Sequence, residues 1–237
     1  MGKIKIKSFG DSAVIIKVGE QSNIETSQRI KIISEQIDQQ RFDGLTEVVL
    51  GLTTITIYYN PFAMYQLYGE SPFRFIHEKL TPIVNKAVYY RENNSRIMTI
   101  PVCYEEELGP DLEAVSIYHQ ISKAELIALH SGQDYVVHMI GFAPGFPYLG
   151  GLCKEIATPR KASPRTRIPA GSVGIGGEQT GIYPIESPGG WNIIGKTPLK
   201  LFRPDDEIPS LLRAGDIVRF QPITFKEFQS LKGAASF

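Results

Sequence analysis

The chain has 237 residues, of which 42% are hydrophobic and 21% are charged, a composition typical of a folded globular protein. Its 25 basic and 25 acidic side chains cancel, so no overall field would attract nucleic acid or an anionic membrane. The presence of only two cysteines excludes a disulfide framework, and no apolar run approaches the roughly 18 residues of a membrane span. We therefore expect a cytoplasmic protein with neither nucleic acid nor a membrane as a partner.

The first 90 residues predict a small α+β unit. Alternating or β-branched runs indicate strands near residues 4–6 and over residues 13–18, 46–50 and 53–59. Apolar residues at helical spacing indicate helices over residues 23–41 and 71–87. Pro82 lies within the second helix and predicts either a kink or a new helix capped by Thr81. This order of elements predicts two helices on one face of an antiparallel sheet.

A second domain is expected over residues 96–237, separated from domain 1–90 by a polar linker at 91–95. Residues 111–131 indicate helices, with a capping box from Ser122 to Glu125. From residue 141 onward, glycine and proline become dense, and short β-forming runs lie between them. Short strands joined by tight turns predict a barrel or a sandwich. A second capping box begins at Thr224 and predicts a short terminal helix.

One glycine-rich segment, Gly190-Trp-Asn-Ile-Ile-Gly-Lys-Thr197, has the spacing of a phosphate-binding loop. Such a loop needs a strand before it and a helix directly after the Lys-Thr pair. Here Pro188 and Pro198 flank the segment, and its interior is rich in β-forming residues. This context favours a turn between two barrel strands over a phosphate loop.

Nucleophile and metal sites find little support in the sequence. Residues 170–174 resemble a serine nucleophile elbow, but the elbow needs glycine where this chain has Ala170. Ser172 is therefore expected to begin a strand or to donate a hydrogen bond to a ligand. The four histidines show no metal-ligand spacing, and no metal is expected. His138 ends an apolar run, which fits a buried core histidine and a functional one equally well.

The most unusual segment is Gly141-Phe-Ala-Pro-Gly-Phe-Pro-Tyr-Leu-Gly-Gly151. Its prolines restrict the backbone, its glycines allow close approach, and its aromatic side chains offer flat apolar surface. A rigid loop of this kind favours a pocket wall, which we expect Phe142, Phe146, Pro147 and Tyr148 to form. The alternative is a loop whose aromatic side chains plug the end of the barrel.

Residues 160–167 are rich in arginine and lysine. Such a run is often a solvated loop, but a guanidinium fork also matches the two oxygens of a carboxylate. We expect Arg167, or with less support Arg165, to hold a substrate carboxylate. Gln179, Trp191 and Asn192 lie near further glycine-rich turns and would add polar and stacking contacts.

Together, these segments resemble the allophanate hydrolase subunit 1 family over essentially the whole chain. The matching segments occur in order at residues 9–14, 138–149, 158–160, 167–174, 179–184 and 187–195. The resemblance implies a ferredoxin-like N-terminal domain and a mainly-β, cyclophilin-like barrel. It also assigns the glycine-tryptophan segment to that barrel, which removes the phosphate-loop interpretation.

The resemblance further implies a function. Members of the family include the B-type component of an ATP-dependent 5-oxoprolinase complex, which cleaves 5-oxoproline to L-glutamate. The implied partners are the C-type and A-type chains of that complex. The complex uses ATP, the component that binds it is not indicated, and this chain is expected to be inactive alone.

Within this family, a second function stays open. Another member inhibits the autophosphorylation of a sporulation sensor histidine kinase, which would make this chain a binding module. A peptidyl-prolyl isomerase has only fold analogy in its favour. For the enzyme, we expect His138 to carry a proton, because the ordinary pKa of imidazole lies nearest neutrality, and Arg167 to hold the substrate.

Overall fold

The computed structural model describes residues 4–21, 23–89 and 95–234. The chain divides into two compact units, Met1–Asn94 and Ser95–Phe237, and each is described by itself. Residues 91–94 of the predicted linker lie outside the described residues. Each unit has its own cluster of buried apolar side chains.

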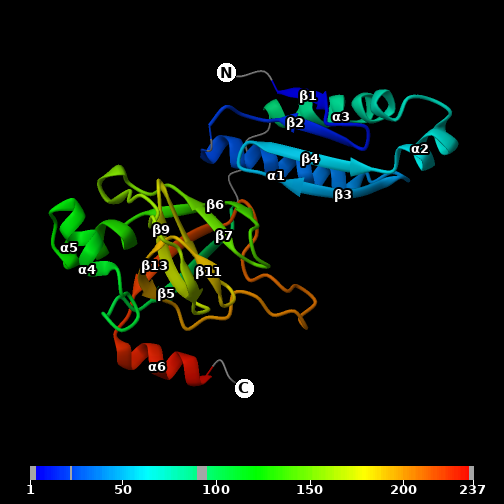
Figure 1. Cartoon of the computed structure of the whole chain (residues 1–237). Coiled ribbons are helices and arrows are strands. Elements are labelled where there is room, and N and C mark those ends of the chain that lie inside the picture. Colours follow the sequence, from blue (N-terminus) through cyan, green and yellow to red (C-terminus); the bar gives the residue numbers. More distant parts are fainter. Residues whose placement is uncertain (1–3, 22, 90–94, 235–237) are drawn as a thin grey trace. The chain divides into compact units, whose positions relative to one another are not determined.

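The first unit is a four-stranded antiparallel sheet with helices (Figure 1). Its elements are β1 (Lys5–Ser8), β2 (Ala13–Lys17), α1 (Ile24–Gln39), β3 (Leu45–Leu50), β4 (Thr54–Tyr59), α2 (Pro61–Tyr68) and α3 (Pro72–Tyr89). The strands lie in the order β1-β2-β4-β3. Helices α1 and α3 pack against each other and against the sheet, and their apolar stripes fill the core with Ile30, Ile33 and Ile76. The predicted strands and both predicted helices are confirmed.

At two prolines of this unit, the structure differs from the elements that the sequence predicted. Asn60 caps a helix that the sequence analysis did not assign: its side chain accepts from the Ala63 amide at 3.0 Å, and Pro61 takes the first helical position. Helix α3 runs through Pro82, so a second helix capped by Thr81 is wrong. The Thr81 hydroxyl instead donates to the His77 carbonyl at 2.6 Å.

The second unit contains a seven-stranded mixed sheet, in the order β12-β9-β10-β7-β6-β13-β5. Its strands are β5 (Ile97–Val102), β6 (Asp134–Ile140), β7 (Pro147–Gly150), β9 (Ser172–Gly176), β10 (Gln179–Ile182), β12 (Asn192–Lys196) and β13 (Ile217–Pro222). A two-stranded ribbon is formed by β8 (Arg165–Ile168) and β11 (Ser187–Gly189). The helices are α4 (Leu112–His119), α5 (Lys123–Ser131), a 3-10 turn at Lys154–Ile156, and α6 (Phe225–Ala234).

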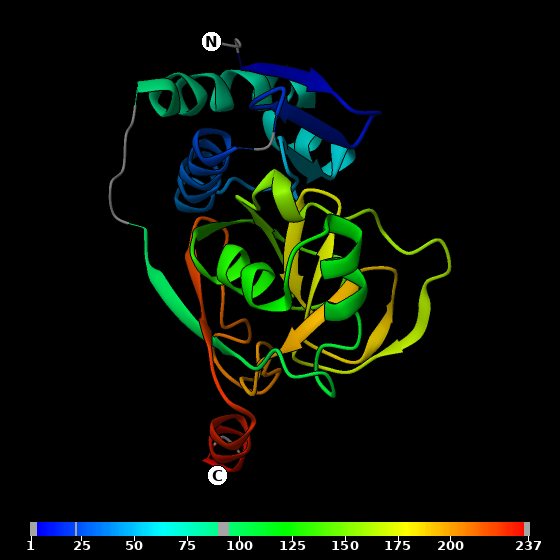
Figure 2. The ribbon, with the colours of Figure 1, turned by 90° about the vertical axis from the view of Figure 1, so that its left-hand side faces the viewer.

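The two edges of the large sheet meet just beyond β5. Cys103 and Lys196 exchange both backbone hydrogen bonds at 2.9 Å, which joins the end of β5 to β12. The sheet therefore curls upon itself, as Figure 2 shows from the side of α4 and α5. A curled sheet in the second unit and an α+β fold in the first confirm the predicted fold class.

Both predicted capping residues are present at the starts of helices in this unit. The Ser122 hydroxyl accepts from the Glu125 amide at 3.1 Å and begins α5. The second capping box is complete: the Thr224 amide donates to Glu227 at 2.8 Å, and the Glu227 amide donates back at 3.3 Å. Among the described residues, no helix is long and apolar enough to span a membrane.

Candidate functional site

Both faces of strands β9 and β10 are buried, but by different kinds of residue. The inner face contributes Val173, Ile175 and Ile182 to the aliphatic core of the barrel. The outer face contributes glycines, because a side chain there would collide with Trp191. A Cβ on Gly176 would lie 2.5 Å from the indole nitrogen, and one on Gly181 would lie 2.9 Å from the indole ring. The dense glycines thus form a flat surface that receives Trp191.

Phe146 is the centre of the aromatic cluster on this outer face. Its ring lies edge-on to Tyr148, Tyr183 and Trp191, with centroids 4.9, 5.2 and 5.5 Å away. Ile168 and Ile193 are buried in the same cluster. We call Phe146, Ile168, Tyr183, Trp191 and Ile193 the outer core. Phe146 and Pro147 are buried, so this part of the loop seals the outer core.

Phe142, in the same loop, has the opposite environment. It is 64% exposed, although its ring lies edge-on to Phe146 at 5.6 Å. Its φ of 68° is in the left-handed region, which a residue with a Cβ adopts only when the surroundings hold it there. The loop therefore presents Phe142 to solvent, while Tyr148, on the other side of Phe146 in the chain, is half-buried.

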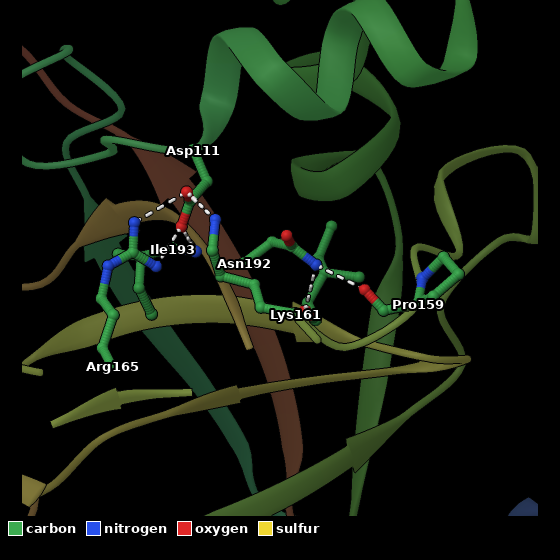
Figure 3. A network of polar contacts seen from close by, with 7 residues as sticks. Asp111, Pro159, Lys161, Arg165, Asn192 and Ile193 are labelled. Atoms are coloured by element: carbon green, nitrogen blue, oxygen red, sulfur yellow. Dashed lines mark hydrogen bonds and ion pairs between the residues drawn. The ribbon is translucent and has the colours of Figure 1, made fainter. Parts of the chain in front are cut away.

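The buried carboxylate of Asp111 anchors the basic loop (Figure 3). Arg165 donates to it through both terminal nitrogens, at 2.7 and 2.8 Å, and Lys161 donates at 2.7 Å. The Ile193 amide donates to the same carboxylate at 2.7 Å, while the Asp111 amide donates to the Ile193 carbonyl at 2.8 Å. Burial opposes ionisation, but these donors outweigh it and lower the pKa of Asp111.

Sequence reasoning missed Asp111. The available signal was its position after Gly109-Pro110 and directly before α4, where an acidic residue commonly caps a helix. The side chain makes no such cap and turns to β12 instead. Gly109 permits this, because a Cβ there would lie 2.3 Å from the Ile194 carbonyl oxygen.

The two predicted carboxylate-binding arginines differ in their present partners. Both terminal nitrogens of Arg165 are engaged by Asp111, inside the protein. Arg167 is 74% exposed and pairs with Glu186 at 2.7 Å. An exposed pair of this kind can exchange for a ligand carboxylate at little cost.

The loop before β8 is fastened to the start of β12 at several points. The Asn192 side-chain amide donates to the Pro159 carbonyl at 2.9 Å, as Figure 3 shows. The Lys161 amide donates to the Gly190 carbonyl at 2.7 Å, and the Arg160 guanidinium lies 5.7 Å from the Trp191 ring centre. Asn192 and Trp191 thus hold the loop in place.

Two further predicted residues lie along β9 and β10. Ser172 is buried, directly opposite Lys196 across β9 and β12. Gln179 begins β10, opposite Gly176, and is partly exposed.

His138 is the extra residue of a β-bulge. Val137 pairs with Leu149 and Met139 pairs with Tyr148, so His138 lies between two registers of β6 and β7. The side chain is buried, and burial lowers its pKa. Its ring occupies the space over Gly150, where a Cβ would lie 1.6 Å from Nε2. His138 and Arg167 come from different sheets, and their joint action on one substrate stays a prediction.

A second histidine, His130, forms a buried polar network that the sequence did not indicate. The Thr180 hydroxyl donates to the Gly174 carbonyl at 3.0 Å, so it accepts from His130 Nε2 at 2.9 Å. Nδ1 then accepts from the Tyr104 hydroxyl at 2.8 Å. Complete burial lowers the pKa of His130 to about 3, which keeps the imidazole neutral.

The segment resembling a phosphate loop is strand β12. Asn192–Lys196 pairs with β9, and no helix follows Thr197. The amides of Lys196 and Thr197 donate to Cys103 and Gly171, so they do not point at a phosphate. The rejection of a phosphate loop is confirmed, and this segment does not fit ATP. Among the described residues, no group of three metal-ligating side chains lies together.

Comparison with known proteins identifies the class of protein. Residues 4–212 match the carboxyltransferase domain family, subdomains C and D. The crystal structure of TTHA0988 superposes with a TM-score of 0.76 at 33% identity, covering 89% of this chain and 39% of that longer chain. The chain therefore belongs to the carboxyltransferase subdomain C and D family.

Named relatives place the chain in one group within this family. The B subunit of 5-oxoprolinase from Bacillus subtilis (strain 168) is 46% identical over 233 residues, which is 97% of each chain. That of Escherichia coli O157:H7 is 39% identical over 94% of this chain and 97% of its own length. Within the carboxyltransferase family, the chain is a member of the group formed by the B subunits of 5-oxoprolinase.

Proposed function

We propose that this chain is the B subunit of an ATP-dependent 5-oxoprolinase complex, which opens the lactam ring of 5-oxoproline to give L-glutamate. The observation that carries the proposal is the 46% identity to the B subunit of a 5-oxoprolinase over 97% of both chains. Similarity of this extent covers both units, so it includes the outer core and the loop that Asp111 anchors.

The proposed partners are the C-type and A-type chains of such a complex. The match to TTHA0988 supports a partner, because this chain covers only 39% of that protein. In that relative, the equivalent of this chain is continuous with a larger amount of further polypeptide. Two separate chains that meet in a complex would be the counterpart of that single chain.

The decisive experiment is reconstitution from separately purified components. We expect this chain to co-purify with the C-type chain. Glutamate release from 5-oxoproline should require ATP and all three components, and leaving out this chain should abolish it. Full activity without this chain would overturn the proposal. Specific inhibition of a sensor kinase, with no glutamate release by the complete complex, would favour the kinase-inhibitor alternative.

The predicted site residues are tested in the same assembled complex. If His138 carries a proton, His138→Ala should lower kcat by about 10²–10⁴-fold, the usual contribution of general acid–base catalysis. If Arg167 holds the substrate carboxylate, Arg167→Lys should mainly raise KM, because lysine cannot reproduce a two-point contact with a carboxylate. Arg203→Lys is the matched control, since Arg203 is likewise exposed and pairs with Asp206. Unchanged kinetics in either test variant would remove that residue from the site.

A further inference from the structure

A groove of about 540 Å³ lies in the second unit, beside the end of strand β12. Gly171, Lys196 and Thr197 line it on one side. Its lining also includes apolar side chains from two loops and from α6, which are Ile185, Leu199, Phe202 and Phe228. A volume of this size suits a small ligand, since ligand pockets commonly measure about 300–1,000 Å³.

The backbone of Lys196 is fixed where it borders this groove. Its backbone exchanges both hydrogen bonds with Cys103, and the following amide of Thr197 donates to Gly171 at 2.9 Å. Gly171 has a φ of 84°, and a Cβ there would lie 2.5 Å from the Thr197 carbonyl oxygen and 3.5 Å from Lys196 Cγ and Cε. The φ and the close approach of the Thr197 carbonyl require glycine at position 171, and the stem of Lys196 runs within van der Waals range of the same position.

Positive charge is concentrated around this groove. Of the described residues, three lysines line it, Lys196, Lys200 and Lys232, and one carboxylate does, that of Glu186, which pairs with Arg167. Within the described part of the chain, no carboxylate lies within 4.0 Å of the Lys196 amine. Burial and the charge of Lys232 lower the pKa of Lys196. The negative charge of a bound anion would offset both the lost solvation of Lys196 and its repulsion by Lys232.

We propose that this groove binds a small organic carboxylate, with the carboxylate on Lys196 and the apolar body against Leu199 and Phe202. Ser172 lies opposite Lys196 in register, so the two side chains share one face of the sheet. The identification of the ligand as 5-oxoproline, a compact lactam with one carboxylate, rests on the proposed function. Lys196, rather than Arg167, then holds the substrate carboxylate.

The test measures binding by calorimetry, with the full chain alone and with the assembled complex. The probes are 5-oxoproline, its uncharged carboxamide and L-glutamate. We expect 5-oxoproline to bind and Lys196→Met to weaken it about 10–100-fold, the usual loss for a charge-assisted hydrogen bond. Lys196→Arg should restore most of the affinity. Lys226→Met is the matched control, since Lys226 is an exposed lysine of α6 outside the groove.

The outcomes separate this proposal from the proposed function. Binding that is unchanged by Lys196→Met, or equal for the acid and its carboxamide, would overturn the groove assignment but not the enzyme. Tighter binding of glutamate than of 5-oxoproline would identify the groove as a product site, which overturns the substrate assignment. Loss of complex formation in Lys196→Met, with small-molecule binding retained, would mean that a partner carboxylate occupies the groove, and would also overturn it.

A pH series gives an independent check. Among the described residues, the charged groups that line the groove with Lys196 are Lys200, Lys232 and Glu186, and Glu186 pairs with Arg167. Because the ammonium form binds the anion, affinity should fall as the pH rises through the lowered pKa of Lys196, below the ordinary 10.5. Lys196→Arg should remove this fall, since arginine stays charged there. A wild-type complex that binds 5-oxoproline but releases no glutamate would contradict the proposed function alone.

Discussion

The barrel core and the outer core share strands β9 and β10 but are built on different principles. Inside, branched aliphatic side chains such as Val173 and Ile175 fill the space between the strands. Outside, the same strands contribute no side-chain volume at Gly176 and Gly181, and Trp191 and Phe146 supply it instead. The aliphatic core fills the inside of the curled sheet. The outer core fixes the loops that carry the candidate site, so the positions of these loops depend on a few large side chains.

The largest expected effect comes from removing the indole on which this outer core depends. Trp191→Ala would leave a cavity over Gly176 and Gly181, and large aromatic truncations cost about 3–5 kcal/mol. The free energy of unfolding in urea should fall by that amount. Ile117→Ala, at a position that is 66% exposed, is the control and should change it little. A loss below about 1 kcal/mol for Trp191→Ala would show that the outer core does not stabilise the unit.

The second effect concerns the charged anchor of the loop. Asp111→Asn keeps the shape of the side chain but removes the charge that Arg165 and Lys161 share. Hydrogen bonds to charged groups contribute about 1.5–3 kcal/mol, so we expect a loss of about 2–3 kcal/mol in the free energy of unfolding. The exposed Asp206→Asn should cost under about 1 kcal/mol, because its contact with Arg203 is solvent-screened. Equal losses in the two variants would contradict the anchoring role of Asp111.

Some of this organisation follows from the sequence. Periodicity and caps predicted the helices at Ile24–Gln39 and Lys123–Ser131, because amphipathic faces and capping side chains are local signals. The capping residue Asn60 and Pro61 carried a similar signal, but a helix of eight residues offers too few turns for periodicity to show. The short β-forming runs and tight turns of the glycine-rich region also predicted a barrel or a sandwich.

The candidate site was less predictable, because its contacts join distant segments. The aromatic loop was expected to line a pocket, yet Phe146 packs over Gly181, about 35 residues further along the chain. Nothing local in the sequence indicates that Asp111 would reach Arg165, 54 positions further on. The resemblance to a known family indicates these segments as the candidate site. It did not determine which of their side chains are engaged within the protein, as those of Arg165 are.

The smallest expected effect concerns the pH dependence of stability. It tests the buried polar network of Tyr104, His130 and Thr180, which lies among the aliphatic side chains of the barrel core. His130 is neutral in the folded state, with a pKa of about 3, whereas in the unfolded chain its ordinary value is 6.5. As the pH falls below 6.5, the unfolded state takes up a proton that the folded state does not, so stability decreases. At pH 5 this loss amounts to about 2 kcal/mol relative to pH 7.

The measurement is urea unfolding at pH 7 and pH 5 for the wild type and for His130→Gln, which cannot titrate in this range. Burial also lowers the pKa of His119 and His138, and both act with the same sign, so a part of the pH dependence should remain in the variant. Carboxylates such as Asp111 contribute mainly at lower pH, because the pKa of Asp111 is lowered from 3.8. The wild type should therefore lose about 2 kcal/mol more than the variant. Equal pH dependence in the two proteins would mean that His130 is protonated in the folded state, which the donor from Tyr104 to Nδ1 does not allow.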